Sequence, residues 1–121
     1  MTYESVAVVE SKIAAGVSYT VAKVSFERRL ELMRRIRELA RRVEFLEAGE
    51  SRGEKMDAAL LRAEIDRTYV LWGLREVSGL EVDGKAATPE ALAGAGPEEL
   101  FREALTAVLA QTGLSDAERK N

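Results

Sequence analysis

The chain contains no cysteine and no histidine. Without cysteine it has no disulfide, no thiolate metal site and no cysteine nucleophile, which is compatible with a reducing compartment. Without histidine it lacks the usual general base near neutral pH and the commonest metal ligand. Catalysis would depend on carboxylate, Lys, Tyr or Ser side chains alone. We therefore expect a protein that is not an enzyme and that has no catalytic, cofactor-binding or metal-binding residues.

Long apolar runs and an excess of positive charge are also missing. No apolar run approaches the roughly 18 to 20 residues that a membrane span needs. The N-terminal MTYESVAVVESK has an acidic residue where a secretory signal would be basic. These features predict a cytoplasmic protein with no membrane partner. The net charge of −3 argues against sequence-independent nucleic-acid binding, and 121 residues fit one domain, residues 1–121.

Residues 5–25 are typical of a β-hairpin. Two stretches rich in Val, Ile, Thr and Tyr, SVAVVESKI and VSYTVAKVS, are separated by AAG, and Gly16 supplies the turn conformation. Val17, Tyr19 and Val21 alternate with residues that face the other way, and neither face is strongly polar. Either the hairpin meets its own helices on one face and a partner on the other, or its own helices cover the whole sheet.

Residues 26–77 predict two long antiparallel helices. Ser25 is placed to cap the first helix, and Gly49 offers a stop. The second helix is expected from about Lys55 to Glu76, after a polar connection at residues 50–54. Tyr69 and Trp72 continue its apolar stripe and are expected in the core. Apolar residues recur at steps of three and four, as Phe26, Leu30, Met33, Ile36, Leu39, Val43 and Leu46 and then as Ala58, Leu61, Ile65, Tyr69 and Trp72.

Residues 78–121 predict a short hairpin followed by C-terminal helices. Asp83 and Gly84 form a strong turn dipeptide between two very short strands. Thr88 and Pro89 favour a helix start, and that helix is expected to stop at Gly94.

A further helix is expected from Gly96-Pro97 to Gly113, and the capping-box spacing in residues 115–118 predicts a last helical turn. The chain as a whole therefore predicts a mainly helical α+β fold. Leu80, Val82 and the segment after Gly113 are candidate contact points for a partner.

Seven arginines in the first predicted helix are the feature most suggestive of nucleic acid. Glu27, Glu31 and Glu38 occupy the same polar surface, and Glu31 and Glu38 precede Arg35 and Arg42 by four residues, the favourable order for ion pairs. We interpret this cluster as a solvated surface laced by ion pairs and expect no nucleic-acid binding. The cluster comprises Arg28, Arg29, Arg34, Arg35, Arg37, Arg41 and Arg42.

Three other groups resemble functional motifs only in part. Of the acidic residues Asp57, Glu64 and Asp66, the last two are two apart on a helix and point in different directions, so no metal site is expected. Residues 83–85 lack the rest of a calcium or phosphate loop and indicate a turn. Residues 94–97 follow no strand, so they indicate the end of one helix and the start of the next rather than a nucleotide-binding site. No small-molecule ligand is evident.

Four phrases follow one another along nearly the whole chain: GVSYTVAKVSFERRLELMRRIRELARRVEFLEAG, YVLWGLREVSGLEVDGKAATPEAL, GPEELFREALTAVL and the C-terminal LSDAERKN. Their order resembles small tail-module proteins of tailed phages and prophages, and most of all the tail assembly chaperones. The resemblance includes no catalytic signature. It implies a cofactor-free protein of the bacterial host cytoplasm that shields a long helical tape-measure protein, or a tube protein, during tail assembly.

Two other functions fit the same features. A structural tail completion or connector subunit would remain in the finished particle, from which a chaperone would be absent. A small dimeric nucleic-acid-binding regulator would show salt-sensitive DNA binding that Arg→Ala changes at Arg34, Arg35, Arg41 and Arg42 abolish. The wide apolar arc of the first helix and the two-faced hairpin fit client binding and homo-oligomerisation equally well. The sequence therefore does not identify the partner-binding residues.

Overall fold

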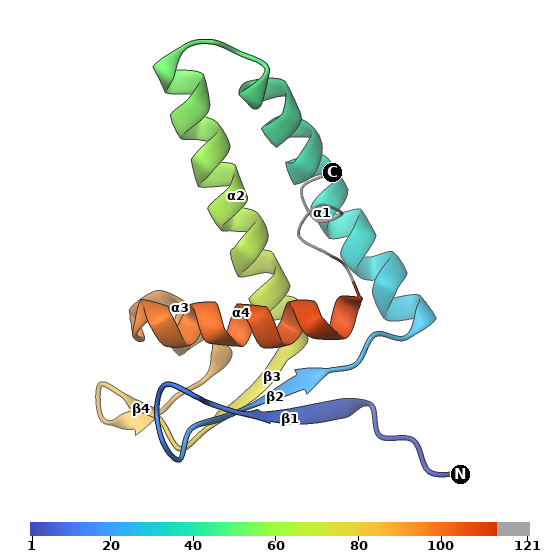
Figure 1. Ribbon diagram of the computed structural model, residues 1–121, viewed down its shortest axis with the longest axis vertical. Helices are drawn as coiled ribbons and strands as arrows, with labels where there is room; N and C mark the ends of the chain where they lie inside the picture. The colour runs from blue at the N-terminus through green and yellow to red at the C-terminus, as the bar shows by residue number, and fades with distance from the viewer. Residues whose placement is uncertain (114–121) are drawn as a thin grey trace. The chain divides into compact units, whose positions relative to one another are not determined.

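The computed structural model describes residues 1–113, and this part of the chain falls into two units that are described separately (Figure 1). Unit 1 consists of Met1–Val24 and Tyr69–Gly113, and the described part of unit 2 is Ser25–Thr68. The described part of unit 2 therefore lies in sequence between the two segments of unit 1. The elements confirm the α+β fold and are, in order, β1 (Val6–Glu10), β2 (Ser18–Ala22), α1 (Phe26–Glu47), α2 (Arg52–Gly73), β3 (Leu74–Ser78), β4 (Glu81–Val82), β5 (Lys85–Ala86), α3 (Pro89–Ala95) and α4 (Glu98–Thr112).

The predicted N-terminal hairpin is confirmed as β1 and β2, and a third strand joins it. The sheet is antiparallel in the order β1-β2-β3, so β2 is its central strand. Gly16 has a φ of 84° in the turn between β1 and β2, as a residue without a side chain allows. Tyr19 and Val21 have no exposed surface, so the face of β2 that carries them is turned into the core.

β3 corrects the predicted end of the second helix. The helix was expected to continue to Glu76, but it ends at Gly73, and Leu74 begins a strand. The register between β2 and β3 shifts between Thr20 and Val21, so β3 carries one extra residue there. This bulge places Leu74 and Val77 on the same buried face although they are three residues apart. The predicted helical hairpin of residues 26–77 is shorter by this strand.

The core of unit 1 lies between the sheet and α4, which crosses it (Figure 1). α4 runs from Glu98 to Thr112, between Pro97 and Gly113, which are the limits predicted from the sequence. Gly113 has a φ of 72°. Leu100, Leu105 and Val108 of α4 are buried, and Val108 lies against Gly73. From α2, Tyr69 and Trp72 are 2% and 4% exposed, which confirms them as core residues.

Two turns of unit 1 meet at a glycine. Gly79 follows β3 with a φ of 80°, and a Cβ atom built there would lie 2.0 Å from the backbone oxygen of Gly16. Both the conformation and the close approach therefore require glycine. The second predicted turn is also confirmed, because Asp83 and Gly84 have φ values of 53° and 80° and connect β4 to β5.

Caps fix the starts of three helices. Ser25 Oγ accepts the Arg28 amide at 3.2 Å, and Thr88 Oγ1 accepts the Ala91 amide at 3.0 Å, which confirms both predicted caps. α2 starts three residues before the predicted Lys55, because Ser51 caps it. Ser51 Oγ accepts the Glu54 amide at 3.1 Å and donates to the Glu54 carboxylate at 2.8 Å.

Unit 2 is a helical hairpin with a small core. α1 and α2 run in opposite directions from a short loop (Figure 1). The predicted stripe of α2 is confirmed, since Ala58, Leu61 and Ile65 are buried in this unit. The helix predicted from the apolar periodicity of α1 is confirmed, and its buried residues are Val43, which belongs to that series, and Leu32, which does not.

The last helical turn predicted for residues 115–118 lies outside the described residues. Within residues 1–113, none of the helices is both long enough and apolar enough to cross a membrane.

Candidate functional site

The most prominent surface feature of unit 2 is a set of large apolar side chains exposed to solvent. In its described part, the hairpin exposes as many large apolar side chains as it has buried apolar residues. The buried residues are Leu32, Val43, Ala58, Leu61 and Ile65. The exposed apolar residues of the hairpin are Phe26, Met33, Phe45, Met56 and Leu60, each between 60% and 76% exposed. An exposed set of large apolar side chains of this size relative to the core marks a candidate binding surface, so this hairpin is the candidate interface.

The arginine cluster of α1 divides into paired and unpaired members. Glu31 accepts from Arg35 at 2.8 Å and lies 3.6 Å from Arg28, so the predicted Glu31–Arg35 pair is confirmed. The structure records no Glu38–Arg42 ion pair, which makes that prediction wrong for the described residues.

The other arginines of the cluster carry no ion pair within residues 1–113, and they are exposed. The predicted surface laced by ion pairs therefore covers only one side of α1. The arginines without an ion pair are Arg29, Arg34, Arg37, Arg41 and Arg42.

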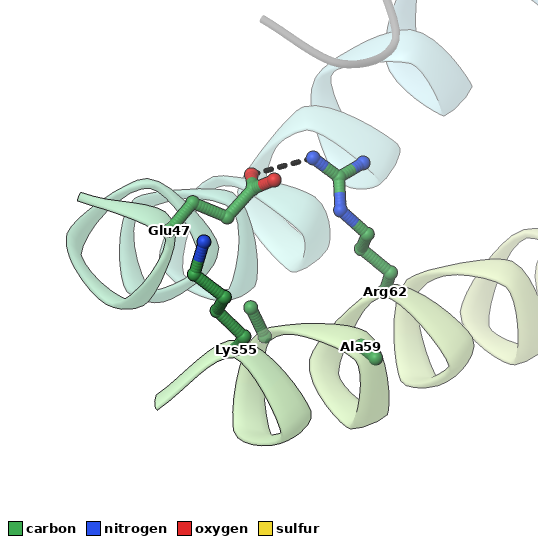
Figure 2. Close-up of a pocket in the computed structure, with 5 residues that line it drawn as sticks. Glu47, Lys55, Ala59 and Arg62 are labelled. Carbon is green, nitrogen blue, oxygen red and sulfur yellow. Dashed lines mark hydrogen bonds and ion pairs between the residues drawn. The ribbon is translucent and has the colours of Figure 1, made fainter. Parts of the chain in front are cut away.

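A small hollow lies where α1 and α2 approach each other near their connection (Figure 2). Its volume is about 280 Å³, and Ala58 and Ala59 form its apolar floor. Glu47 on α1 forms an ion pair with Arg62 on α2 at 2.5 Å across it, and Lys55 also lines it. Both partners of the ion pair are partly exposed. The hollow is open to solvent and has no buried polar group aimed into it, so we assign it to the joining of the two helices rather than to a ligand.

A hydrogen-bonded cluster in unit 1 was not predicted. The Glu103 carboxylate on α4 accepts from Ser11 Oγ at 2.5 Å, from the Lys12 amide at 2.8 Å and from the Tyr19 hydroxyl at 2.8 Å. Ser11 Oγ also accepts the amides of Ile13 at 3.1 Å and Ala14 at 2.9 Å. One helix side chain thus holds both the turn after β1 and the central strand β2.

The environment of this cluster sets the pKa values of both acids. Burial raises the pKa of Tyr19 to about 12, with a further contribution from its hydrogen bond to Glu103. Burial acts to raise the pKa of Glu103, but hydrogen bonds from Ser11, Lys12 and Tyr19 outweigh it and lower that pKa below its ordinary value. At neutral pH Tyr19 therefore stays protonated and Glu103 stays ionised. Neither group suits proton transfer near neutral pH, so the cluster is a structural clamp.

The remaining sequence candidates do not form a site. Within residues 1–113, no group of three or more Asp or Glu side chains is arranged to hold a metal ion, and Asp57, Glu64 and Asp66 are not brought together. Residues 83–85 form the β4–β5 turn, and residues 94–97 separate α3 from α4. Leu80 and Val82, expected as contact points, are half-buried in unit 1.

Comparison of the chain with protein-family models, with curated proteins and with solved structures finds no match. The functional argument therefore rests on the sequence and on the surface of the molecule itself.

Proposed function

We propose that this protein is a non-enzymatic binding protein of tailed-phage or prophage tail assembly, of chaperone type. Its helical hairpin shields an apolar, helical segment of a tape-measure or tube protein until the segment enters the tail. The assignment to tail assembly comes from the order of sequence phrases described above.

The observation that supports a binding function is the exposure of apolar side chains on α1 and α2. Phe26 and Phe45 are each 76% exposed, and Leu60 on α2 is 65% exposed. Fully burying such a side chain contributes roughly 1.5 to 3 kcal/mol. Contact with a partner would therefore recover a favourable free energy that the hairpin alone leaves unused.

An amphipathic helix is the partner that fits this surface best. Two helices present apolar residues at helical spacing, and a client helix that lies along them can bury its own apolar stripe. A tape-measure protein contains long helical segments that need such cover before assembly. The exposed ends of the hairpin side chains can repack around different client sequences, and the methionines Met33 and Met56 are especially suited to this.

The experiment is co-expression of the tagged protein with tape-measure and tube proteins of a tailed phage, followed by capture and mass spectrometry. We expect capture of one of these clients and loss of capture for the variant Leu60→Ser. The matched control is Val8→Ser on β1, because Val8 is 66% exposed and Leu60 is 65% exposed. Equal capture by both variants, or no client at all, would contradict the proposal.

The same cells separate the chaperone from a structural subunit. A chaperone is present in lysates and absent from purified tails, whereas a completion or connector subunit is present in both. Recovery of the protein in finished particles at a fixed ratio to the tube protein would replace the chaperone assignment with the structural one.

A further inference from the structure

Three of the unpaired arginines of α1 share a face with two of its exposed apolar residues. Residues at positions 26, 30, 33, 37 and 41 are separated by four, three, four and four positions, which places them on one side of a helix. Residue 34 lies beside them, four positions after residue 30 and three before residue 37. This basic–apolar face of α1 consists of Phe26, Leu30, Met33, Arg34, Arg37 and Arg41.

The face is open in the described structure. Phe26 is 76% exposed and Met33 is 60% exposed, and the three arginines are exposed and form no ion pair within residues 1–113. Leu32 and Val43, the buried residues of α1, occupy another face.

Carboxylates do not neutralise this face. Glu31 is engaged with arginines on another side of α1. Glu38 borders the centre of the face, four positions after Arg34 and three before Arg41. Glu27 and Glu44 lie toward its two ends. Within residues 1–113 none of these carboxylates forms an ion pair with the arginines of the face. With three arginines against one carboxylate at its border, the centre of the face presents net positive charge and apolar surface together.

We infer that the basic–apolar face of α1 binds an acidic amphipathic helix, which rests on the proposed function and names the chemistry of the client segment. The apolar stripe of such a helix covers Phe26 and Met33, and glutamates or aspartates beside that stripe meet Arg34, Arg37 and Arg41. The face runs from position 26 to position 41, so it spans roughly 22 Å at 1.5 Å per residue. A client segment of about four helical turns matches this length.

Two other occupants fit less well. Nucleic acid would satisfy the arginines, but phosphates gain nothing from Met33 and Leu30, and the chain carries a net charge of −3. A second copy that met the same face symmetrically would bring arginines against arginines. An acidic helix satisfies both the charged and the apolar members of the face.

The test is titration of the full-length protein with two synthetic helical peptides that share one apolar stripe. One peptide has glutamates beside the stripe, and the other has glutamines at those positions. We expect the acidic peptide to bind about tenfold more tightly at about 50 mM salt, and the difference to shrink at about 500 mM salt. Fluorescence anisotropy of labelled peptides measures both dissociation constants.

Single substitutions assign the binding to this face. Arg37→Glu should weaken the acidic peptide about fivefold and leave the glutamine peptide nearly unchanged, because only the first peptide carries opposing charge. Met33→Ser should weaken both peptides. The controls are Arg42→Glu, which reverses an exposed arginine on another side of α1, and Val8→Ser on β1. Both controls should stay within about twofold of the parent protein.

Three results would overturn the inference: equal affinity for the two peptides, equal sensitivity to Arg37→Glu and Arg42→Glu, or binding of an oligonucleotide in preference to the acidic peptide. If client capture still depends on Leu60 in these cases, the proposed function stands and only the acidic-helix site is lost. If the peptides behave as expected but no tail protein is captured, the tail assignment fails and the acidic-helix site remains.

Discussion

Replacing Glu103 with alanine tests how much the clamp in unit 1 contributes to folding. Each of the three hydrogen bonds to this carboxylate is charge-assisted, and such bonds contribute roughly 1.5 to 3 kcal/mol when they are well shielded. The groups at Ser11 and Lys12 are partly or fully open to solvent, so water replaces much of their loss. Tyr19 has no exposed surface, so its hydroxyl would be left without an acceptor. We expect Glu103→Ala to lower the free energy of unfolding by about 3 kcal/mol.

Urea denaturation measures this cost. Trp72 is 4% exposed in unit 1 and reports its unfolding by fluorescence, while far-UV circular dichroism reports all helices. With a slope of about 1.5 kcal/mol per M, the loss moves the midpoint down by about 2 M. Glu103→Gln keeps an oxygen acceptor without the charge and should cost about half as much.

The matched control is Glu99→Ala, which removes an exposed carboxylate from the same helix. It should cost less than about 0.5 kcal/mol. A loss of similar size for Glu99→Ala and Glu103→Ala would refute the clamp. So would a Glu103→Ala midpoint that stays within error of the parent protein.

Three further perturbations follow from the same structure. Because the pKa of Glu103 is lowered in the folded state, the unfolded state binds more protons in acid. The free energy of unfolding should therefore decrease as the pH falls below about 4.3, and it should decrease less steeply in Glu103→Gln. Urea midpoints measured across a pH series test this. Gly79→Ala meets the opposing turn backbone at 2.0 Å with a φ of 80° and should cost about 2 kcal/mol or more, whereas Gly94→Ala, which meets nothing within 4 Å in a helix, should be neutral or stabilising in thermal unfolding. Arg62 and Glu47 are partly exposed, so a double-mutant cycle should give a coupling of about 0.5 kcal/mol that about 1 M salt removes; a coupling above about 2 kcal/mol would contradict this account.

Local signals in the sequence predicted the elements that local chemistry determines. Ser25 and Thr88 are caps because their hydroxyls accept amides three residues later, and both positions were predicted. The turn at Asp83 and Gly84 was predicted because few dipeptides tolerate positive φ at both positions. The buried side of α2 was predicted because its apolar residues recur at steps of three and four, which places them on one side of the helix.

The missed features depend on partners far along the chain. Leu74 and Val77 are three residues apart, which is the spacing of residues on one side of a helix. In the strand β3 they lie on one face only because of the bulge opposite β2. Glu103 lies 92 residues from Ser11 and 84 residues from Tyr19, so nothing near it in sequence marks it as their acceptor.

The side of α1 that is buried could not be predicted either. Its apolar residues cover a wide arc, within which Leu32 is buried while Met33 is exposed. A sequence pattern alone gives the width of the arc but not the part of it that is buried in the folded chain.

The position of residues 25–68 of unit 2 between the two segments of unit 1 has a consequence for folding during synthesis. The contacts of α1 and α2 are local, so this hairpin can form soon after Thr68 leaves the ribosome. The N-terminal hairpin emerges first, but two strands alone are marginally stable in water, and it must wait for β3 and α4. Until Glu103 has been translated, Tyr19 has neither its helix cover nor its hydrogen-bond acceptor. The β1–β2 hairpin therefore reaches its final structure only after β3 and α4 have been made.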